Sequence, residues 1–157
     1  MENYMKLEIL AVSENESFAR NAVAAFALPL NPTLSELSDV KTAVSEAVTN
    51  CVVHAYKNTE KSNKILLECH IVKEGEGGSL HIAITDDGCG IDNIELATTP
   101  FFTTLSGGER SGMGFTIMKT FMDGFAVVSE KGKGTRIEMQ KRLGVTAENL
   151  ERKRVDA

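Results

Sequence analysis

Apolar positions along the chain recur with two periods, one near 3.6 residues and one of two residues. The longer period predicts amphipathic helices and the shorter period predicts half-buried strands. We expect helices from Ser13 toward Pro29, from Thr33 to Ala55, and from the last glycine pair to Gly124. We expect strands at residues 6–12, 64–73, 79–86, 125–130 and 135–141. Runs of strands and helices in this order are typical of an α+β domain.

Helix caps and tight turns set the limits of these elements. Ser13 with Glu16 and Thr33 with Glu36 both match a capping box, in which a hydroxyl and a carboxylate bind the first N–H groups of a helix. The glycine-rich turns EGEGG and KGKG join the strands into two hairpins. We therefore expect one domain over residues 1–143, with helices on one face of a mixed, mostly antiparallel sheet, and a charged tail over 144–157.

Composition and charge narrow the class of protein. The chain has 157 residues, of which 42% are hydrophobic and 25% charged, as in ordinary soluble domains. It has no apolar run near the roughly 20 residues of a membrane span. The net charge of −5 argues against direct binding of nucleic acid, which needs cationic residues. The three cysteines lack metal-ligand spacing, which indicates a reducing, cytoplasmic location.

One helix carries an unexpected polar row within AVSEAVTNCVVHAY. Glu46 and Asn50 are four residues apart, so they share one face of the helix, roughly opposite its apolar stripe. Such a pair is commonly just a solvated helix face. The alternative is a site, because a carboxylate can accept a proton from a hydroxyl and a carboxamide oxygen suits a hard cation such as Mg²⁺.

A second candidate site directly follows a predicted strand, in the run DDGCG that begins at Asp86. Asp and Gly are common in tight turns, which is the simplest interpretation. In the functional interpretation, the Asp86 carboxylate accepts a hydrogen bond from an exocyclic amine such as that of adenine. Gly88 and Gly90 would then let a planar ring approach the backbone.

Two further glycine motifs follow. Gly112 and Gly114 open a predicted helix, where backbone N–H groups and the helix dipole attract phosphate. Arg110 lies beside them and could reach a terminal phosphate, and the polar segment upstream, from residue 98, is long enough for a lid. In the last hairpin, the run KGKGT places the Thr135 hydroxyl at the start of a strand, where it could lie near a bound base.

Together these motifs, E-x-x-x-N, D-x-G-x-G, G-x-G and G-x-T in that order, are more specific than any one alone. The constellation resembles the ATP-binding superfamily of gyrase, Hsp90-type chaperones, histidine kinases and mismatch-repair ATPases, over residues 7–141. The resemblance implies a two-layer α/β sandwich of the Bergerat type with an ATP lid, and ATP with Mg²⁺ as cofactors. A P-loop motif is absent from the sequence.

Within this superfamily the chain most resembles the bacterial anti-sigma factors that act as serine kinases. It is too short for the gyrase and chaperone enzymes, and its histidines lack the acidic neighbour expected in a histidine kinase. The runs ENESFAR, VSEAVTN and ERSGMGFTIMKTFMD look like the sporulation type, with the general-stress type as the nearest rival. The resemblance implies a homodimer that inhibits a sporulation sigma factor and phosphorylates a serine of its anti-anti-sigma antagonist.

The resemblance also implies roles for individual residues. Glu46 is expected to be the general base and Asn50 the Mg²⁺ ligand. The nucleotide is expected to contact Asp86, Gly88, Gly90, Arg110, Gly112, Gly114 and Thr135. Arg20, on the first helix and away from these motifs, is expected to contact a protein partner. A competing interpretation is a binding module in which ATP only orders the lid; the acid at position 46 argues against it.

Overall fold

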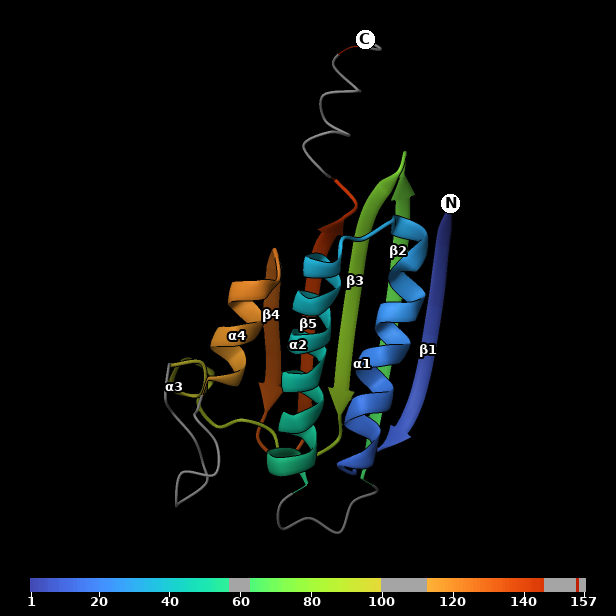
Figure 1. Ribbon diagram of the computed structural model, residues 1–157. Coiled ribbons are helices and arrows are strands. Elements are labelled where there is room, and N and C mark those ends of the chain that lie inside the picture. The colour runs from blue at the N-terminus through green and yellow to red at the C-terminus, as the bar shows by residue number, and fades with distance from the viewer. Residues whose placement is uncertain (57–62, 100–112, 146–154, 156–157) are drawn as a thin grey trace.

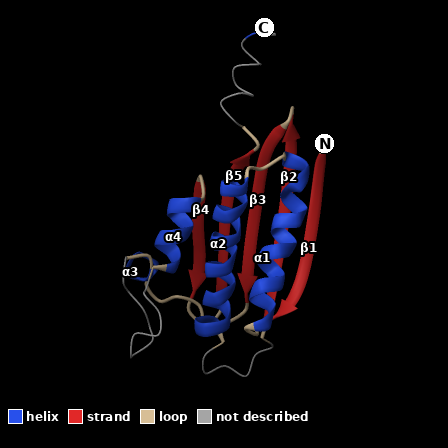
Figure 2. Ribbon diagram, viewed as in Figure 1, coloured by secondary structure: helices blue, strands red, loops and turns tan. Residues whose placement is uncertain are grey.

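The computed structural model describes residues 1–56, 63–99, 113–145 and 155. Five strands form one sheet, and the helices lie against one of its faces (Figures 1 and 2). In chain order the elements are β1 (Glu2–Leu10), α1 (Glu14–Ala27), a 3₁₀ turn (Leu28–Leu30), α2 (Leu34–Asn50), a π-helical turn (Cys51–Ala55), β2 (Lys64–Glu74), β3 (Gly77–Asp86), α3 (Ile94–Ala97), α4 (Gly114–Phe121), β4 (Gly124–Glu130) and β5 (Gly134–Leu143).

The sheet has the order β1-β2-β3-β5-β4, and each neighbouring pair of these described strands is antiparallel. The predicted α+β sandwich is confirmed, with both predicted hairpins in place, but the described sheet is entirely antiparallel and not mixed. The first strand begins earlier than its alternation predicts, because residues from Glu2 onward pair with the far half of β2, where Glu2 faces Val72. The short helix α3 was not expected. No described helix is long and apolar enough to cross a membrane.

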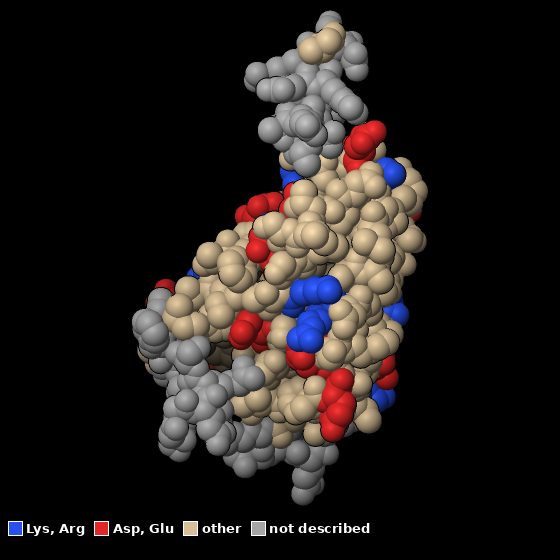
Figure 3. Space-filling view, viewed as in Figure 1, with Lys and Arg blue, Asp and Glu red and all other residues tan. Residues whose placement is uncertain are grey.

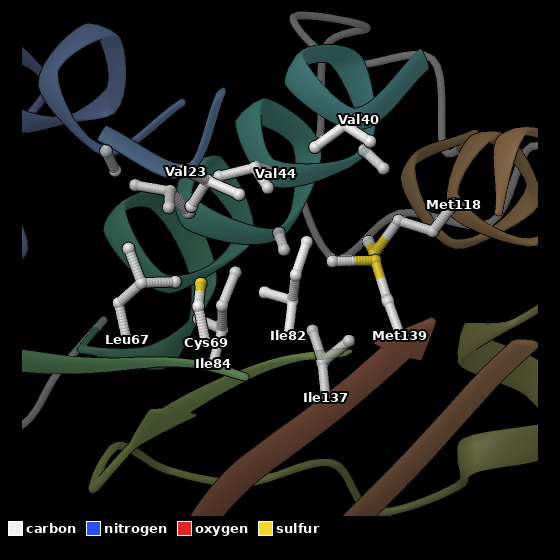
Figure 4. Close-up of a cluster of buried hydrophobic side chains, with 14 of the residues drawn as sticks. Val23, Val40, Val44, Leu67, Cys69, Ile82, Ile84, Met118, Ile137 and Met139 are labelled. Atoms are coloured by element: carbon white, nitrogen blue, oxygen red, sulfur yellow. The ribbon is translucent and has the colours of Figure 1, made fainter. Parts of the chain in front are cut away.

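The core lies between the helices and the sheet. Figure 4 shows side chains from α1, α2 and α4 meeting side chains that rise from β2, β3 and β5. Val44 and Met118 are fully buried, and they face Ile82, Ile137 and Met139, which are each 2% exposed. Burying a side chain of this size contributes about 1.5–3 kcal/mol. This packing fixes α4 beside α2, which positions the polar residues at their ends.

A half-buried lysine holds the C-terminal end of α4. The Lys141 ammonium, on β5, donates to the Phe121 carbonyl at the end of α4 at 2.6 Å and lies 3.5 Å from the Asp39 carboxylate of α2. Its side chain is only 12% exposed, so the interaction is weakly screened by solvent. Lys141 thereby joins α4, α2 and β5.

One of the two predicted capping boxes is confirmed and the other is wrong. Thr33 accepts from the Glu36 N–H at 3.1 Å, and the Glu36 carboxylate accepts from the Thr33 N–H at 2.8 Å. The Ser13 side chain makes no capping hydrogen bond. Glu16, its predicted partner, instead accepts from the Ser45 hydroxyl of α2, so a tertiary contact has replaced the local one.

Candidate functional site

The polar row of α2 faces the first turn of α4. A Cβ placed on Gly114 would lie 3.2 Å from Glu46 Oε2 and 3.3 Å from Asn50 Oδ1, so only a glycine fits there without displacing these side chains. Both Glu46 and Asn50 are half-buried. Three of the predicted site residues are therefore brought together. The Glu46 carboxylate and the Asn50 carboxamide lie beside the first turn of α4, whose N–H groups have no partner within the helix.

Asp86 ends β3 and is the one buried charged side chain among the described residues, at 6% exposed. Its Oδ1 accepts from the Gly88 N–H at 2.9 Å, its Oδ2 accepts from the Cys51 thiol at 3.5 Å, and the Thr135 N–H also bonds to the carboxylate. Burial raises the pKa of Asp86 above its ordinary value, although these three donors oppose the shift. A buried acceptor at a strand end suits an amine-bearing ligand.

The glycines after Asp86 pack against the chain's own backbone. A Cβ on Gly88 would lie 2.1 Å from the Ala55 carbonyl oxygen, and one on Gly90, whose φ is +73°, would lie 2.1 Å from the Glu130 carbonyl oxygen. The Cys89 N–H donates to Ala55 at 2.6 Å. The loop is thus held between the π-helical turn and the β4–β5 hairpin, which is a packing reason for both glycines in addition to the predicted approach of a ring.

Tyr56 holds this loop from the opposite side. Its hydroxyl accepts from the Asp87 N–H at 3.0 Å and donates to the Lys64 carbonyl at the start of β2. Tyr56 follows the π-helical turn Cys51–Ala55, a rare local geometry that is found frequently at functional sites. The end of α2, the end of β3 and the start of β2 are therefore joined at the lower end of the molecule in Figure 1.

Thr135 lies opposite Asp86 in the register of β3 and β5. Its hydroxyl is 2.8 Å from the Ser129 hydroxyl, which also accepts from the Ile91 N–H at 2.8 Å and contacts the Gly134 carbonyl at 2.9 Å. Two acceptors, the Asp86 carboxylate and the Thr135 hydroxyl, are therefore adjacent at the same strand end. This arrangement can recognise a group that donates hydrogen bonds.

The described residues contain no cluster of three or more His, Cys, Asp or Glu side chains that could hold a metal ion. A cation here would need oxygen atoms from a ligand in addition to the Asn50 carboxamide. Polyphosphate supplies such oxygens, because Mg²⁺ is usually bound through one or two protein groups together with substrate phosphates.

Comparison with known proteins decides the family. The model of the histidine kinase-like ATPase domain matches residues 11–141. An anti-sigma F factor of Clostridium acetobutylicum is 51% identical over 145 residues, which are 92% of this chain and 97% of that protein. An anti-sigma F factor of Clostridium kluyveri is 54% identical over 140 residues, 89% of this chain and 94% of that protein. The chain belongs to the anti-sigma F factors. It is an anti-sigma factor with a kinase-like ATPase domain.

Solved structures agree with the fold expected of an anti-sigma F factor. The RsbU and RsbW domains of a Mycobacterium tuberculosis protein superpose with a TM-score of 0.63 at 17% identity, over 90% of this chain and 32% of that chain. The mycobacterial sensor histidine kinase MprB superposes with a TM-score of 0.50 at 17% identity, over 90% of this chain and 98% of that chain. At this identity the likeness shows the fold alone.

Arg20 of this anti-sigma F factor lies on α1, apart from the cluster around Asp86. Its guanidinium donates to Glu16 Oε1 at 2.9 Å, and the same carboxylate binds Ser45, the neighbour of Glu46. Figure 3 shows Lys and Arg atoms near the middle of the helical face, with Asp and Glu atoms beside them. Arg20 is the one cation of α1 and Lys41 the one cation of α2.

Two predicted site residues, Arg110 and Gly112, lie outside the described residues, as do most of the predicted lid and of the tail over 144–157. Sequence reasoning missed three residues of the site. The Cys51 thiol, which contacts Asp86, belongs to none of the predicted motifs, and neither do Tyr56 and Ser129. Their contacts depend on strand register and on the π-helical turn, which no local pattern specifies.

Proposed function

We propose that this anti-sigma F factor binds ATP with Mg²⁺ and transfers the terminal phosphoryl group to a serine of an anti-anti-sigma protein. The observation that carries the proposal is the convergence of Glu46 and Asn50 on the first turn of α4. This convergence supports the proposal, because a carboxylate could there accept a proton beside a carboxamide that could hold a cation, and a helix start nearby could bind phosphate.

The nucleotide would lie across residues from both halves of the chain. Asp86 would accept from the adenine amine, with Gly88 and Gly90 shaping the loop beneath the base. Thr135 would support the base from the neighbouring strand. The phosphates would lie at Arg110, Gly112 and Gly114, with Arg110 reaching the terminal phosphate.

Glu46 would accept the proton of the incoming serine hydroxyl, which is general-base catalysis. Bound ATP would supply the transferable phosphoryl group, and Mg²⁺ held by Asn50 would neutralise its charge. Glu46 is half-buried, so its carboxylate keeps contact with solvent. Phosphoryl transfer depends mainly on positioning and charge neutralisation.

The protein partners would be a sporulation sigma factor, which the chain inhibits, and the anti-anti-sigma antagonist, which releases the sigma factor until it is phosphorylated. The protein would act as a cytoplasmic homodimer, with its kinase domain over residues 1–143 and its tail over 144–157. Arg20 would contact a partner through the face formed by α1 and α2. A charge-reversed Arg20 that binds both partners normally would exclude this role.

Transfer from γ-labelled ATP to the anti-anti-sigma protein tests the proposal. We expect label on a serine of the antagonist, and none on an antagonist in which that serine is replaced by alanine. The same preparation should pull down the sigma factor. Addition of the unphosphorylated antagonist should abolish this pull-down. ATP binding without any transfer to the antagonist would show a nucleotide-gated binding module instead.

A further inference from the structure

We propose that Ser129 fixes the direction of the Thr135 hydroxyl, so that the base subsite presents only hydrogen-bond acceptors and selects adenine over 6-oxopurines. Ser129, at the end of β4, is a positioning residue in this proposal, because it acts through Thr135 and not on the ligand. The inference rests on the proposed binding of ATP, and it adds the basis of base selectivity.

The argument begins with the three contacts of the Ser129 hydroxyl. Its oxygen is 2.8 Å from the Ile91 backbone nitrogen, 2.9 Å from the Gly134 carbonyl oxygen and 2.8 Å from the Thr135 hydroxyl oxygen. A serine hydroxyl has one hydrogen and two lone pairs. Three contacts therefore use its full capacity, and each contact must take a defined direction.

Only one arrangement of hydrogens satisfies all three contacts. The Ile91 N–H can only donate, so it uses one lone pair of Ser129. The Gly134 carbonyl can only accept, so it takes the single hydrogen of Ser129. The remaining lone pair of Ser129 can then only accept, and the Thr135 hydroxyl must be the donor. If Ser129 instead donated to Thr135, two oxygens would face each other at 2.9 Å at Gly134 without a hydrogen between them.

The consequence for Thr135 is that its own hydrogen is already used. Its free lone pairs can only accept hydrogen bonds from a ligand. The backbone N–H of Thr135 bonds to the Asp86 carboxylate, so the second acceptor of the subsite is directly beside the first. The exocyclic amine of adenine carries two hydrogens, one for each acceptor. The 6-oxo group of hypoxanthine or guanine is itself an acceptor, and the N1–H of these bases can donate to only one of the two. Two adjacent acceptors therefore favour adenine and leave a 6-oxo group without a partner.

The same contacts link the subsite to the loop after β3. Ile91 follows Gly90 directly, and Ser129 connects this loop to the β4–β5 hairpin through the Ile91 N–H. Replacing Ser129 by alanine would remove the acceptor for Thr135, whose hydroxyl could then rotate and donate to a 6-oxo group. Selectivity should fall even if the fold is retained.

Binding of ADP and of IDP, measured by calorimetry with the whole chain, tests this inference without consuming the ligand. We expect the wild type to bind ADP more tightly than IDP. Ser129→Ala should lower the IDP-to-ADP ratio of dissociation constants about five- to tenfold, the effect of one hydrogen bond. Ser129→Thr, which keeps the hydroxyl, should retain the ratio, and Ser79→Ala, on β3, is the matched serine control.

A double-mutant cycle separates this role from a purely structural one. In a Thr135→Val background, Ser129→Ala should change the ratio no further, because Thr135 no longer has a hydroxyl to orient. An unchanged ratio in Ser129→Ala, equal losses for ADP and IDP, or a further fall in the Thr135→Val background would each overturn the inference. If Ser129→Ala does not fold, Ser129→Cys gives the same comparison with a weaker acceptor.

The outcome is distinguishable from failure of the proposed kinase activity. Wild-type selectivity for ADP that depends on Ser129, in a protein that transfers no phosphoryl group, would support the inference and contradict the kinase. If the protein phosphorylates the antagonist but Ser129→Ala leaves the IDP-to-ADP ratio of dissociation constants unchanged, the kinase is supported and the inference is contradicted. A wild type that binds ADP and IDP equally would overturn the inference.

Discussion

Asp86 combines two properties that rarely coexist in one side chain: it is buried, and its carboxylate contacts no cationic side chain in the part of the chain that the structure describes. The hydrogen-bond donors to the Asp86 carboxylate are two backbone N–H groups and a thiol. Burying an ionised carboxylate costs free energy that neutral donors offset only in part. A ligand that donates further hydrogen bonds to Asp86 would recover some of this cost on binding.

We predict that Asp86→Asn weakens ATP binding at least about tenfold, because the amide both loses the charge and presents donors toward the adenine amine. Calorimetric titration of ATP measures the effect. Asp87→Asn is the matched control, since Asp87 is exposed and adjacent, and it should bind ATP as the wild type does. Equal affinity in the wild type and Asp86→Asn would contradict the assigned role.

The same residue predicts a dependence of stability on pH. Burial raises the pKa of Asp86 above the ordinary value of 3.8, so in the window above that value the folded protein holds a proton that the unfolded chain has lost. The contribution of Asp86 to the free energy of unfolding therefore falls as the pH rises through this window and stays low above it. Unfolding by urea from about pH 3.5 to about pH 7.5, without nucleotide, should show Asp86→Asn gaining stability relative to the wild type as the pH rises. A difference independent of pH would contradict the raised pKa.

The three thiols should differ sharply in reactivity. Burial raises the pKa of Cys69 to about 12 and that of Cys51 well above its ordinary value, whereas Cys89 is exposed. Because the thiolate is the reactive form, we expect Cys89 alone to react rapidly with a disulfide reagent at about pH 8. Counting the released thiolate over time measures this. The control variant Cys89→Ser should lose the rapid reaction. Rapid reaction of two or more thiols in the folded wild type would contradict the structure.

At the scale of elements, the two predicted helix caps offer a matched pair. Thr33 caps α2 through a reciprocal pair of hydrogen bonds, and the Glu36 carboxylate also accepts from the Gly144 N–H at 3.0 Å. We predict that Thr33→Ala lowers the free energy of unfolding by about 1 kcal/mol. Ser13→Ala should change it by less than about 0.5 kcal/mol, because Ser13 makes no cap. Equal losses in the two variants would show that the Thr33 cap contributes nothing.

These caps also show how far the sequence predicts the elements. The Thr33 cap is local, since both partners lie within four residues, and the pattern predicted it correctly. The Ser13 cap failed because Glu16 has a distant competitor in Ser45. The shared face of Glu46 and Asn50 followed from helical spacing alone, but their convergence on Gly114 depends on how α4 packs against α2. Strand register, which places Thr135 opposite Asp86, was likewise not readable from alternation.

At the scale of the whole molecule, the site lies where the ends of several elements meet. α2 ends, β3 ends and β5 begins at one end of the sheet, so the motifs that are separated by up to about 90 positions in the chain become neighbours. Their fixed order in the sequence indicated the family, and the resemblance predicted that they contribute to one site. The arrangement around Ser129 and Tyr56 was not predictable, because it depends on the loop after β3 being held between two other elements.

The measurement that tests the central claim most directly is single-turnover transfer from ATP to the anti-anti-sigma protein by wild type and Glu46→Gln, with ATP affinity measured in parallel. We predict that Glu46→Gln lowers the transfer rate about 10²- to 10⁴-fold, the usual contribution of a general base, and leaves ATP affinity within about twofold. Glu8→Gln, an exposed carboxylate on β1, should retain the wild-type rate. A wild-type transfer rate in Glu46→Gln would contradict the account.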